Sequence, residues 1–263
     1  MTTAEGELKT ELVDGVGVVS FNRPHRHNAI TDSLFDQLCA ALRGYLNDGS
    51  VRCVLIRGEG RSFCSGRDTA ELGKRAAGED DFTFVKAHQR IRLEVLESTT
   101  PVVAAVQGAA LGGGFEVALS ADMRIIAEDA IFELPEVGLG LVPDTGGTQL
   151  LPALVGPARA KYLVLSGARI DARTAYAWGL AEEVVPVEDL YDRAMTLCRQ
   201  LAGQPKLATS MGKLLVNQAT AGAVRNGLGQ ELLAQTALFR SDEYQSIKDE
   251  ALRRRNASEG DGT

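Results

Sequence analysis

The sequence has few residues of the kinds that bind metals. It holds four cysteines (Cys39, Cys53, Cys64 and Cys198) without a CxxC pair, and three histidines among 263 residues. Structural zinc needs clusters of cysteine and histidine at short spacings, so we expect no metal site. The segment Met1–Glu5 has neither the basic nor the apolar region of a secretory signal. We therefore expect a reducing cytoplasm as the location of the protein.

Excess basic charge and long apolar runs are also missing. The net charge is −7, and the binding of nucleic acid needs a basic face, so we expect no nucleic-acid partner. The most apolar stretch, Val102 to Leu111, contains Gln107 and Gly108 and is too short to span a bilayer, so we expect no membrane insertion. A small anionic ligand stays compatible with this composition, because it needs only a local basic patch.

Apolar runs and helical patterns alternate along the first 187 or so residues, which is typical of an α/β fold. The patterns predict strands at 15–21, 53–57, 102–106, 123–127, 131–133 and 184–185. They predict helices at 31–46, 70–99, 115–121, 146–154, 158–165 and 171–178. The first is capped by Thr31 or Asp32, and the second has a flexible, charged middle around Gly78 to Asp81. From Asp189 onward the pattern is only helical. At a length of 263 residues, this fits one large domain or a domain with an appendage.

A glycine triplet, Gly112-Gly113-Gly114, follows a predicted buried strand and precedes a helix. Glycine lets the backbone approach a ligand closely, and the first amides of a helix lack partners within it. Such a turn can hold a developing negative charge. The alternative is a tight strand-to-helix turn without a ligand. A phosphate loop is excluded, because neither Lys-Ser/Thr nor GxGxxG spacing is present.

A second loop of small residues, Arg61 to Asp68 (RSFCSGRD), also follows a strand. Two such loops can each offer one amide to a single oxygen, which makes an oxyanion hole. Ser65 could instead be a nucleophile, but no GxSxG elbow or nearby histidine supports this, so we favour its backbone amide. Cys64 could be a reactive thiol, although a small buried filler is the simpler reading.

Acidic residues lie among apolar ones in the segment 132–147. A carboxyl group at Glu136 or Asp144 that is buried there would have a raised pKa and could transfer protons. The alternatives are a solvated loop, or Asp144 as the cap of the helix that follows Gly146.

Four segments together resemble the crotonase, or enoyl-CoA hydratase/isomerase, superfamily. They are NRPHRHNA (22–29), GRSFCSGRD (60–68), the long block from Pro101 to Pro152, and LSGARIDARTAYAWGLAEEVV (165–185). The resemblance implies a spiral of β-β-α turns over residues 1–188, which carries an acyl-CoA site. It also implies a helical trimerisation region over residues 189–263, and hence a homotrimer or hexamer.

The resemblance also implies roles for individual residues. The catalytic acids of the hydratases fall on Glu116 and Glu136, and the oxyanion-hole amides are assigned to Ser65 and Gly113. Further positions are implied to bind substrate: Arg26, Cys64, Gly66, Arg67, Asp68, Gly112 and Asp144. No cofactor is implied, because coenzyme A is part of the substrate.

The activity that this resemblance implies is the reversible addition of water to a 2-enoyl-CoA thioester, with Glu136 as the principal acid/base. Asp144 departs from the pattern of the simple hydratases, which usually have a small residue at this position. An acid at that position is similar to the isomerases of the family and to carnitinyl-CoA dehydratase. The alternatives are therefore an enoyl- or dienoyl-CoA double-bond isomerase, a carnitinyl-CoA-type dehydratase, or a catalytically silent acyl-CoA binding scaffold.

Overall fold

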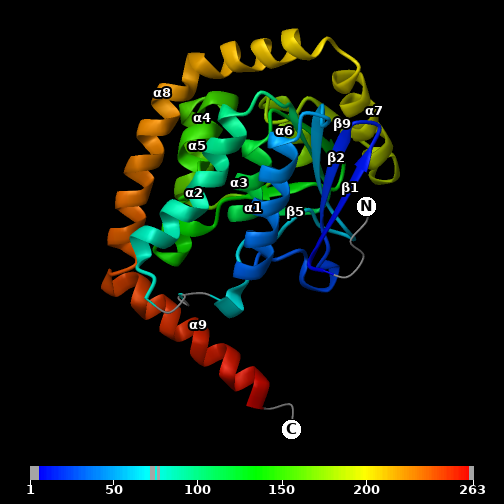
Figure 1. The fold of residues 1–263 in the computed structure, drawn as a ribbon. Helices are drawn as coiled ribbons and strands as arrows, with labels where there is room; N and C mark the ends of the chain where they lie inside the picture. The colour runs from blue at the N-terminus through cyan, green and yellow to red at the C-terminus, as the bar shows by residue number, and fades with distance from the viewer. Residues whose placement is uncertain (1–5, 72–74, 76–77, 261–263) are drawn as a thin grey trace.

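The computed structural model describes residues 6–71, 75 and 78–260 and contains two β-sheets (Figure 1). The larger sheet has the strand order β1-β2-β3-β4-β6-β9, and the smaller one has the order β5-β7-β8. Strands β1 and β2 are antiparallel, and the rest of the larger sheet is parallel. The strands are β1 Leu8–Val13, β2 Val16–Phe21, β3 Cys53–Gly58, β4 Val102–Val106, β5 Ala109–Leu111, β6 Met123–Ala127, β7 Ile131–Glu133, β8 Ile170–Asp171 and β9 Glu183–Val185.

The chain winds as a spiral of β-β-α turns. Strand β4 of the larger sheet is followed by β5 of the smaller sheet and then by helix α3 (Gly113–Ser120). Strand β6 is likewise followed by β7 and then, after a loop, by helices α4 (Gly147–Val155) and α5 (Pro157–Ser166). The predicted α/β spiral is therefore confirmed, although the sequence patterns did not reveal the short strands β5 and β8 or the edge strand β1.

Helix α1 (Asp32–Asn47) begins where the sequence predicts it. The Thr31 hydroxyl accepts a hydrogen bond from the amide of Leu34 at 3.0 Å, which is the geometry of an N-cap. Its buried face, Leu34, Phe35, Leu38, Cys39 and Leu42, repeats at helical spacing.

The helix predicted at 70–99 is wrong in its first part. Thr69–Glu71 form only a short 3-10 turn, and α2 runs over Asp81–Glu97. Gly78 has a φ of +81°, and the Asp80 carboxylate accepts from the amide of Thr83 at 2.7 Å, so a new helix begins there. The predicted residues 72–74 and 76–77 lie outside the described residues.

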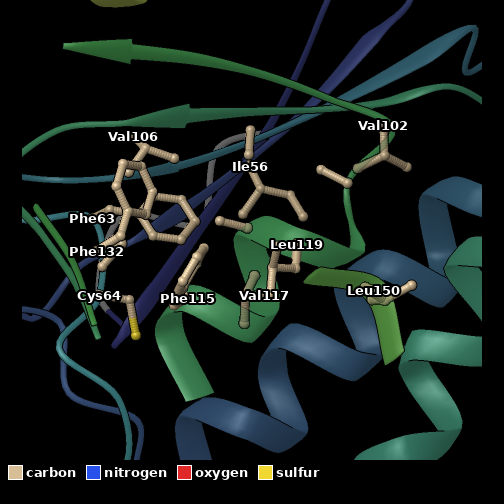
Figure 2. Packing of buried hydrophobic residues seen from close by; sticks show 14 of the residues in the cluster. Ile56, Phe63, Cys64, Val102, Val106, Phe115, Val117, Leu119, Phe132 and Leu150 are labelled. Carbon is tan, nitrogen blue, oxygen red and sulfur yellow. The ribbon is translucent and has the colours of Figure 1, made fainter. Parts of the chain in front are cut away.

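Helix α3 carries the centre of the larger core cluster (Figure 2). Its side chains Phe115, Val117 and Leu119 are all buried, and Leu119 lies close to Ile56 on the side of the helix that faces the sheet. Phe115 also packs on Phe132 with ring centroids 5.0 Å apart. The helix that follows the glycine triplet is therefore fixed along its whole length, and its N-terminus keeps a defined position.

The helical region predicted from Asp189 consists of α7 (Leu190–Ala202), α8 (Lys206–Leu238) and α9 (Asp242–Gly260). Helix α7 buries Leu190, Ala194, Met195 and Cys198 against strands of the larger sheet. Figure 1 shows α8 passing around the outside of the core near α2 and α4, and α9 leading away from it. The division at residue 188 stays a prediction, and α7 packs on the core. No helix among the described residues is both long and apolar enough to cross a membrane.

Candidate active site

A cavity of about 250 Å³ lies between the two loops of small residues and the inner faces of α2 and α8. Eight of the sequence-predicted site residues line it: Ser65, Gly66, Arg67, Gly112, Gly113, Glu116, Glu136 and Asp144. The fold therefore brings together residues from four separate segments of the chain. Apolar side chains complete the wall, among them Ile30, Phe35, Phe84, Leu139 and Leu141.

The glycine triplet forms the turn that enters α3. Gly112 has a φ of +50°, and a Cβ there would lie 2.7 Å from the Glu136 Oε1 atom. A Cβ on Gly114 would lie 2.2 Å from the Cys64 carbonyl oxygen, so only glycine permits this contact between the two loops. Gly113 is the first residue of α3, where the helix leaves amides without a partner of its own. Its amide is thus positioned to bind an oxygen with partial negative charge.

The second loop differs from the prediction at Ser65. The Ser65 amide donates to the carbonyl oxygen of His27 at 3.0 Å, so it is already used within the fold. In the next residues of the loop, the Gly66 carbonyl and the Asp68 amide both bond to Ile30, in a parallel bridge centred on Arg67. The amide of Arg67 therefore points away from that bridge, and among the described residues it has no backbone acceptor.

Glu116, on the first turn of α3, is held by the segment that enters α4. Its Oε1 atom accepts from the amides of Thr145 and Gly147 at 2.9 and 2.8 Å. Its Oε2 atom accepts from the Thr145 hydroxyl at 2.7 Å. The side chain is 2% exposed. A carboxyl group that accepts three hydrogen bonds is bound in a single orientation, with both of its oxygens acting as acceptors.

Glu136 lies at the start of a 3-10 turn, Glu136–Leu139, and faces Gly112. Burial is the main reason why its pKa is raised well above the ordinary value, and the negative charge of Glu116 adds to the effect. Its Oε2 atom is buried and makes no hydrogen bond in the described part of the chain. The site therefore holds one glutamate fixed by donors and a second that favours a proton.

Asp144 does not cap α4. The N-cap of that helix is Gly146, which has no side-chain cap, and the entering amides are bound by two glutamates instead. Glu116 binds those of Thr145 and Gly147, and Glu231 of α8 accepts from the amides of Gly146 and Thr148 at 2.9 and 3.1 Å.

Burial and the charge of Glu116 raise the pKa of Asp144 to about 7, and a hydrogen bond with Gln235 opposes this shift. Asp144 thus titrates near neutral pH beside the two glutamates. The same two causes, burial first, raise the pKa of Glu231 to about 8.

Three of the predicted substrate-binding residues do not line the cavity. Arg26 is exposed on a 3-10 turn. Cys64 is fully buried, and burial raises the pKa of its thiol to about 12, which makes it an inert filler rather than a nucleophile. Asp68 forms an ion pair with Arg23 at 3.0 Å and binds the amide of Ala70. Their part in binding substrate stays a prediction.

Sequence reasoning missed His88 and Arg92 of α2 and Gln235 and Tyr244 from the C-terminal helices, which also line the cavity. Helical periodicity predicted a helix in this region, but not that polar residues on its buried face meet a cavity. No group of three or more metal-binding side chains occurs among the residues that the structure describes.

Comparison with known proteins agrees with this geometry. The family model for enoyl-CoA hydratase/isomerase matches residues 11–256. The chain is 34% identical over 240 residues to a 1,2-epoxyphenylacetyl-CoA isomerase of Escherichia coli, covering 90% of this chain and 92% of that one. It is 35% identical over 206 residues to a mitochondrial enoyl-CoA hydratase of Pongo abelii, covering 78% and 69%.

Solved structures show the same fold. An enoyl-CoA hydratase from Mycobacterium avium subsp. paratuberculosis superposes with a TM-score of 0.85 at 30% identity, covering 94% of this chain and 99% of that one. The family match spans nearly the whole chain, and it includes both loops and all three acidic residues of the cavity. The chain belongs to the enoyl-CoA hydratase/isomerase family.

Proposed function

We propose that the protein is an enoyl-CoA hydratase, which adds water reversibly to a 2-enoyl-CoA thioester. The observation that carries the proposal is the pair Glu116 and Glu136 in one cavity, one held by three donors and the other with a raised pKa. Hydration needs a base for water and an acid for carbon. Two carboxyl groups with different environments supply both.

In the proposed reaction, Glu116 takes a proton from water as the water oxygen bonds to C3 of the substrate. The electron pair of the C2–C3 double bond moves towards the thioester, whose carbonyl oxygen gains negative charge. Glu136, whose raised pKa favours the protonated form, gives its proton to C2. The sequence interpretation made Glu136 the principal acid/base and Glu116 its water-positioning partner. The three donors to Glu116 and the raised pKa of Glu136 support instead a division of roles between base and acid.

We propose that the amides of Gly113 and Arg67 bind the developing oxyanion. This replaces Ser65, whose amide is bonded to His27. Gly66, which precedes Arg67, comes close to the triplet: a Cβ on Gly66 would lie 3.6 Å from the Gly113 nitrogen. The N-terminal end of α3 adds a partial positive charge at the same place.

The test is a pair of assays on the purified protein. Hydration is followed as the loss of enone absorbance of crotonyl-CoA, and isomerisation as the conversion of a 3-enoyl-CoA to its 2-enoyl isomer. We expect hydration to be the faster reaction in the wild type and to fall by orders of magnitude in Glu116→Gln. Faster isomerisation than hydration would overturn the assignment.

A second candidate function, double-bond isomerisation, is supported by Asp144. Its carboxyl lies in the same cavity with a pKa of about 7, so it can both take and return a proton at neutral pH. One of the relatives is named an isomerase. If this function holds, Asp144→Asn abolishes the double-bond shift and spares hydration, because asparagine cannot carry a proton.

We also propose a homotrimer or a hexamer, assembled through the C-terminal helices. Large apolar side chains are exposed on α8, including Leu207 at 76%, Leu215 at 61% and Val216 at 72%. Such a row on the outer face of a long helix is typical of a surface that another chain covers. Sedimentation at micromolar concentration tests this, and a monomer would contradict it.

A further inference from the structure

The polar atoms that lack partners are gathered at one place in the molecule. In the part of the chain that the structure describes, the buried side-chain atoms without a hydrogen bond belong to His88, Arg92, Glu136 and Tyr244. All four residues line the cavity. Buried polar atoms are nearly always paired, so orphans concentrated in one cavity indicate a ligand that pairs them. The proposed hydration uses Glu136 and leaves the others without a role.

Arg92 is the group among these whose burial without hydrogen-bond partners destabilises the fold most. Its side chain is 2% exposed, and its Nε and Nη1 atoms make no hydrogen bond to any described residue. Burial lowers the pKa of Arg92, and the charge of Glu116 opposes this shift. An arginine whose donors are unused deep in a protein is unfavourable for the fold unless a bound group meets it.

His88 lies one helical turn before Arg92 on the same face of α2. Its ring stacks on Phe35 with centroids 3.9 Å apart, and its Nδ1 atom is 2.9 Å from the Phe84 carbonyl oxygen. A carbonyl oxygen only accepts, so Nδ1 carries the proton. Burial lowers the pKa of His88 to about 4, and the ring is neutral at neutral pH. The unpaired Nε2 atom is therefore an acceptor.

One helix face thus offers the cavity two donors from Arg92 and one acceptor from His88. A plain alkyl chain would leave all three unpaired. A carboxylate would suit Arg92 but would oppose the lone pair of His88 and add charge beside Glu116 and Asp144. A hydroxyl group suits both residues, because its oxygen accepts from Arg92 while its proton is donated to His88.

We propose that the acyl pocket is specific for an acyl-CoA whose acyl chain carries a hydroxyl group beyond the reacting carbons, and that Arg92 and His88 bind this hydroxyl. The inference rests on the proposed function only in placing an acyl thioester in the cavity. A cationic acyl group, such as one with a trimethylammonium end, is disfavoured by the charge of Arg92.

The test measures equilibrium binding, which needs no turnover. Isothermal titration calorimetry compares hexanoyl-CoA with 4-, 5- and 6-hydroxyhexanoyl-CoA, saturated compounds that hydration does not consume. A site that hydrogen-bonds a hydroxyl discriminates strongly against the compound without it. We expect at least one hydroxylated compound to bind the wild type about tenfold or more tightly than hexanoyl-CoA.

Variants on α2 locate the preference. The affinity ratio compares binding of the preferred hydroxylated compound with binding of hexanoyl-CoA. Arg92→Met should bring this ratio close to one, mainly by weakening the binding of the hydroxylated compound. His88→Phe keeps a ring against Phe35, removes the acceptor, and should reduce the ratio as well. The matched control is Arg90→Met on the same helix; Arg90 is 74% exposed, pairs with Glu94, and should leave the ratio at the wild-type value.

Three results would overturn the inference. They are equal binding of all four compounds to the wild type, a ratio that persists in both Arg92→Met and His88→Phe, and tighter binding of 6-carboxyhexanoyl-CoA than of any hydroxylated compound. Crotonyl-CoA hydration is measured in parallel. Hydration without a hydroxyl preference refutes only this inference, whereas a hydroxyl preference without hydration refutes only the proposed reaction.

Discussion

Replacing Glu136 by glutamine is the substitution whose effect the structure defines most closely. The two side chains have the same shape, but an amide cannot give a proton to C2. Loss of a positioned acid lowers turnover by about 10²- to 10⁴-fold, or about 2.7–5.4 kcal/mol of barrier. Glu136 Oε2 has no hydrogen-bond partner among the described residues, so the substitution breaks no contact of that atom. We therefore expect kcat to fall by this factor in a folded protein.

Stability gives the same variant an independent readout. The pKa of Glu136 is raised by burial and by Glu116, so folding takes up a proton, and the native state loses stability as the pH rises above about 4.5. Glutamine has no proton to lose. The free energy of unfolding of Glu136→Gln, relative to that of the wild type, should therefore increase with pH.

The assay is steady-state hydration of crotonyl-CoA, with urea unfolding at several pH values on the same samples. Glu133→Gln is the matched control: Glu133 lies on the neighbouring strand β7, pairs with Arg169 at 2.5 Å and does not line the cavity. It should keep kcat within about threefold, since it moves no proton in the reaction. If Glu136→Gln also keeps kcat within that range, Glu136 is not the acid and the proposed mechanism is wrong.

Three further predictions follow from the contacts of the site. Gly113→Pro removes an amide at the first helical position, where proline fits, and should lower kcat by about 10²–10³-fold; Gly113→Ala keeps the amide, meets nothing within 4 Å, and should stay near wild type. Asp144→Asn should flatten the loss of stability that the wild type shows as the pH rises from about 4 to about 7, because the pKa of Asp144 is raised in the fold. Glu231→Ala leaves the amides of Gly146 and Thr148 without their acceptor and should lower the free energy of unfolding by about 1–3 kcal/mol, measured by urea titration.

Local patterns predicted the parts of the fold that depend on neighbouring residues. The cap at Thr31, the turn at Gly112–Gly114 and the helix after it follow from nearby residue types, and the structure confirms them. The sequence marked an irregular, charged stretch around Gly78 to Asp81 within the helix predicted at 70–99, and the structure starts α2 there, where Gly78 has a positive φ and Asp80 caps the helix. Strands β5 and β8 have three and two residues, too few to show a period.

The predicted site depended on contacts between distant segments. Glu116 and Glu136 could be proposed from the family resemblance, but Glu116 gains its donors from Thr145 and Gly147, which only the folded chain brings near. The Ser65 amide looked available in the sequence and is bonded to His27. For Asp144, the cap interpretation fails because Glu116 and Glu231 already occupy the amides that enter α4.

The central claim is that the cavity adds water across the double bond of an enoyl-CoA, with Glu116 and Glu136 as base and acid. Its most direct test is mass spectrometry of the product formed from crotonyl-CoA in water enriched in oxygen-18. The account predicts 3-hydroxybutyryl-CoA with the heavy oxygen at C3 from the wild type, and a rate lower by about 10²-fold or more from Glu116→Gln and Glu136→Gln. Product without heavy oxygen, or equal labelling rates in all three proteins, would contradict it.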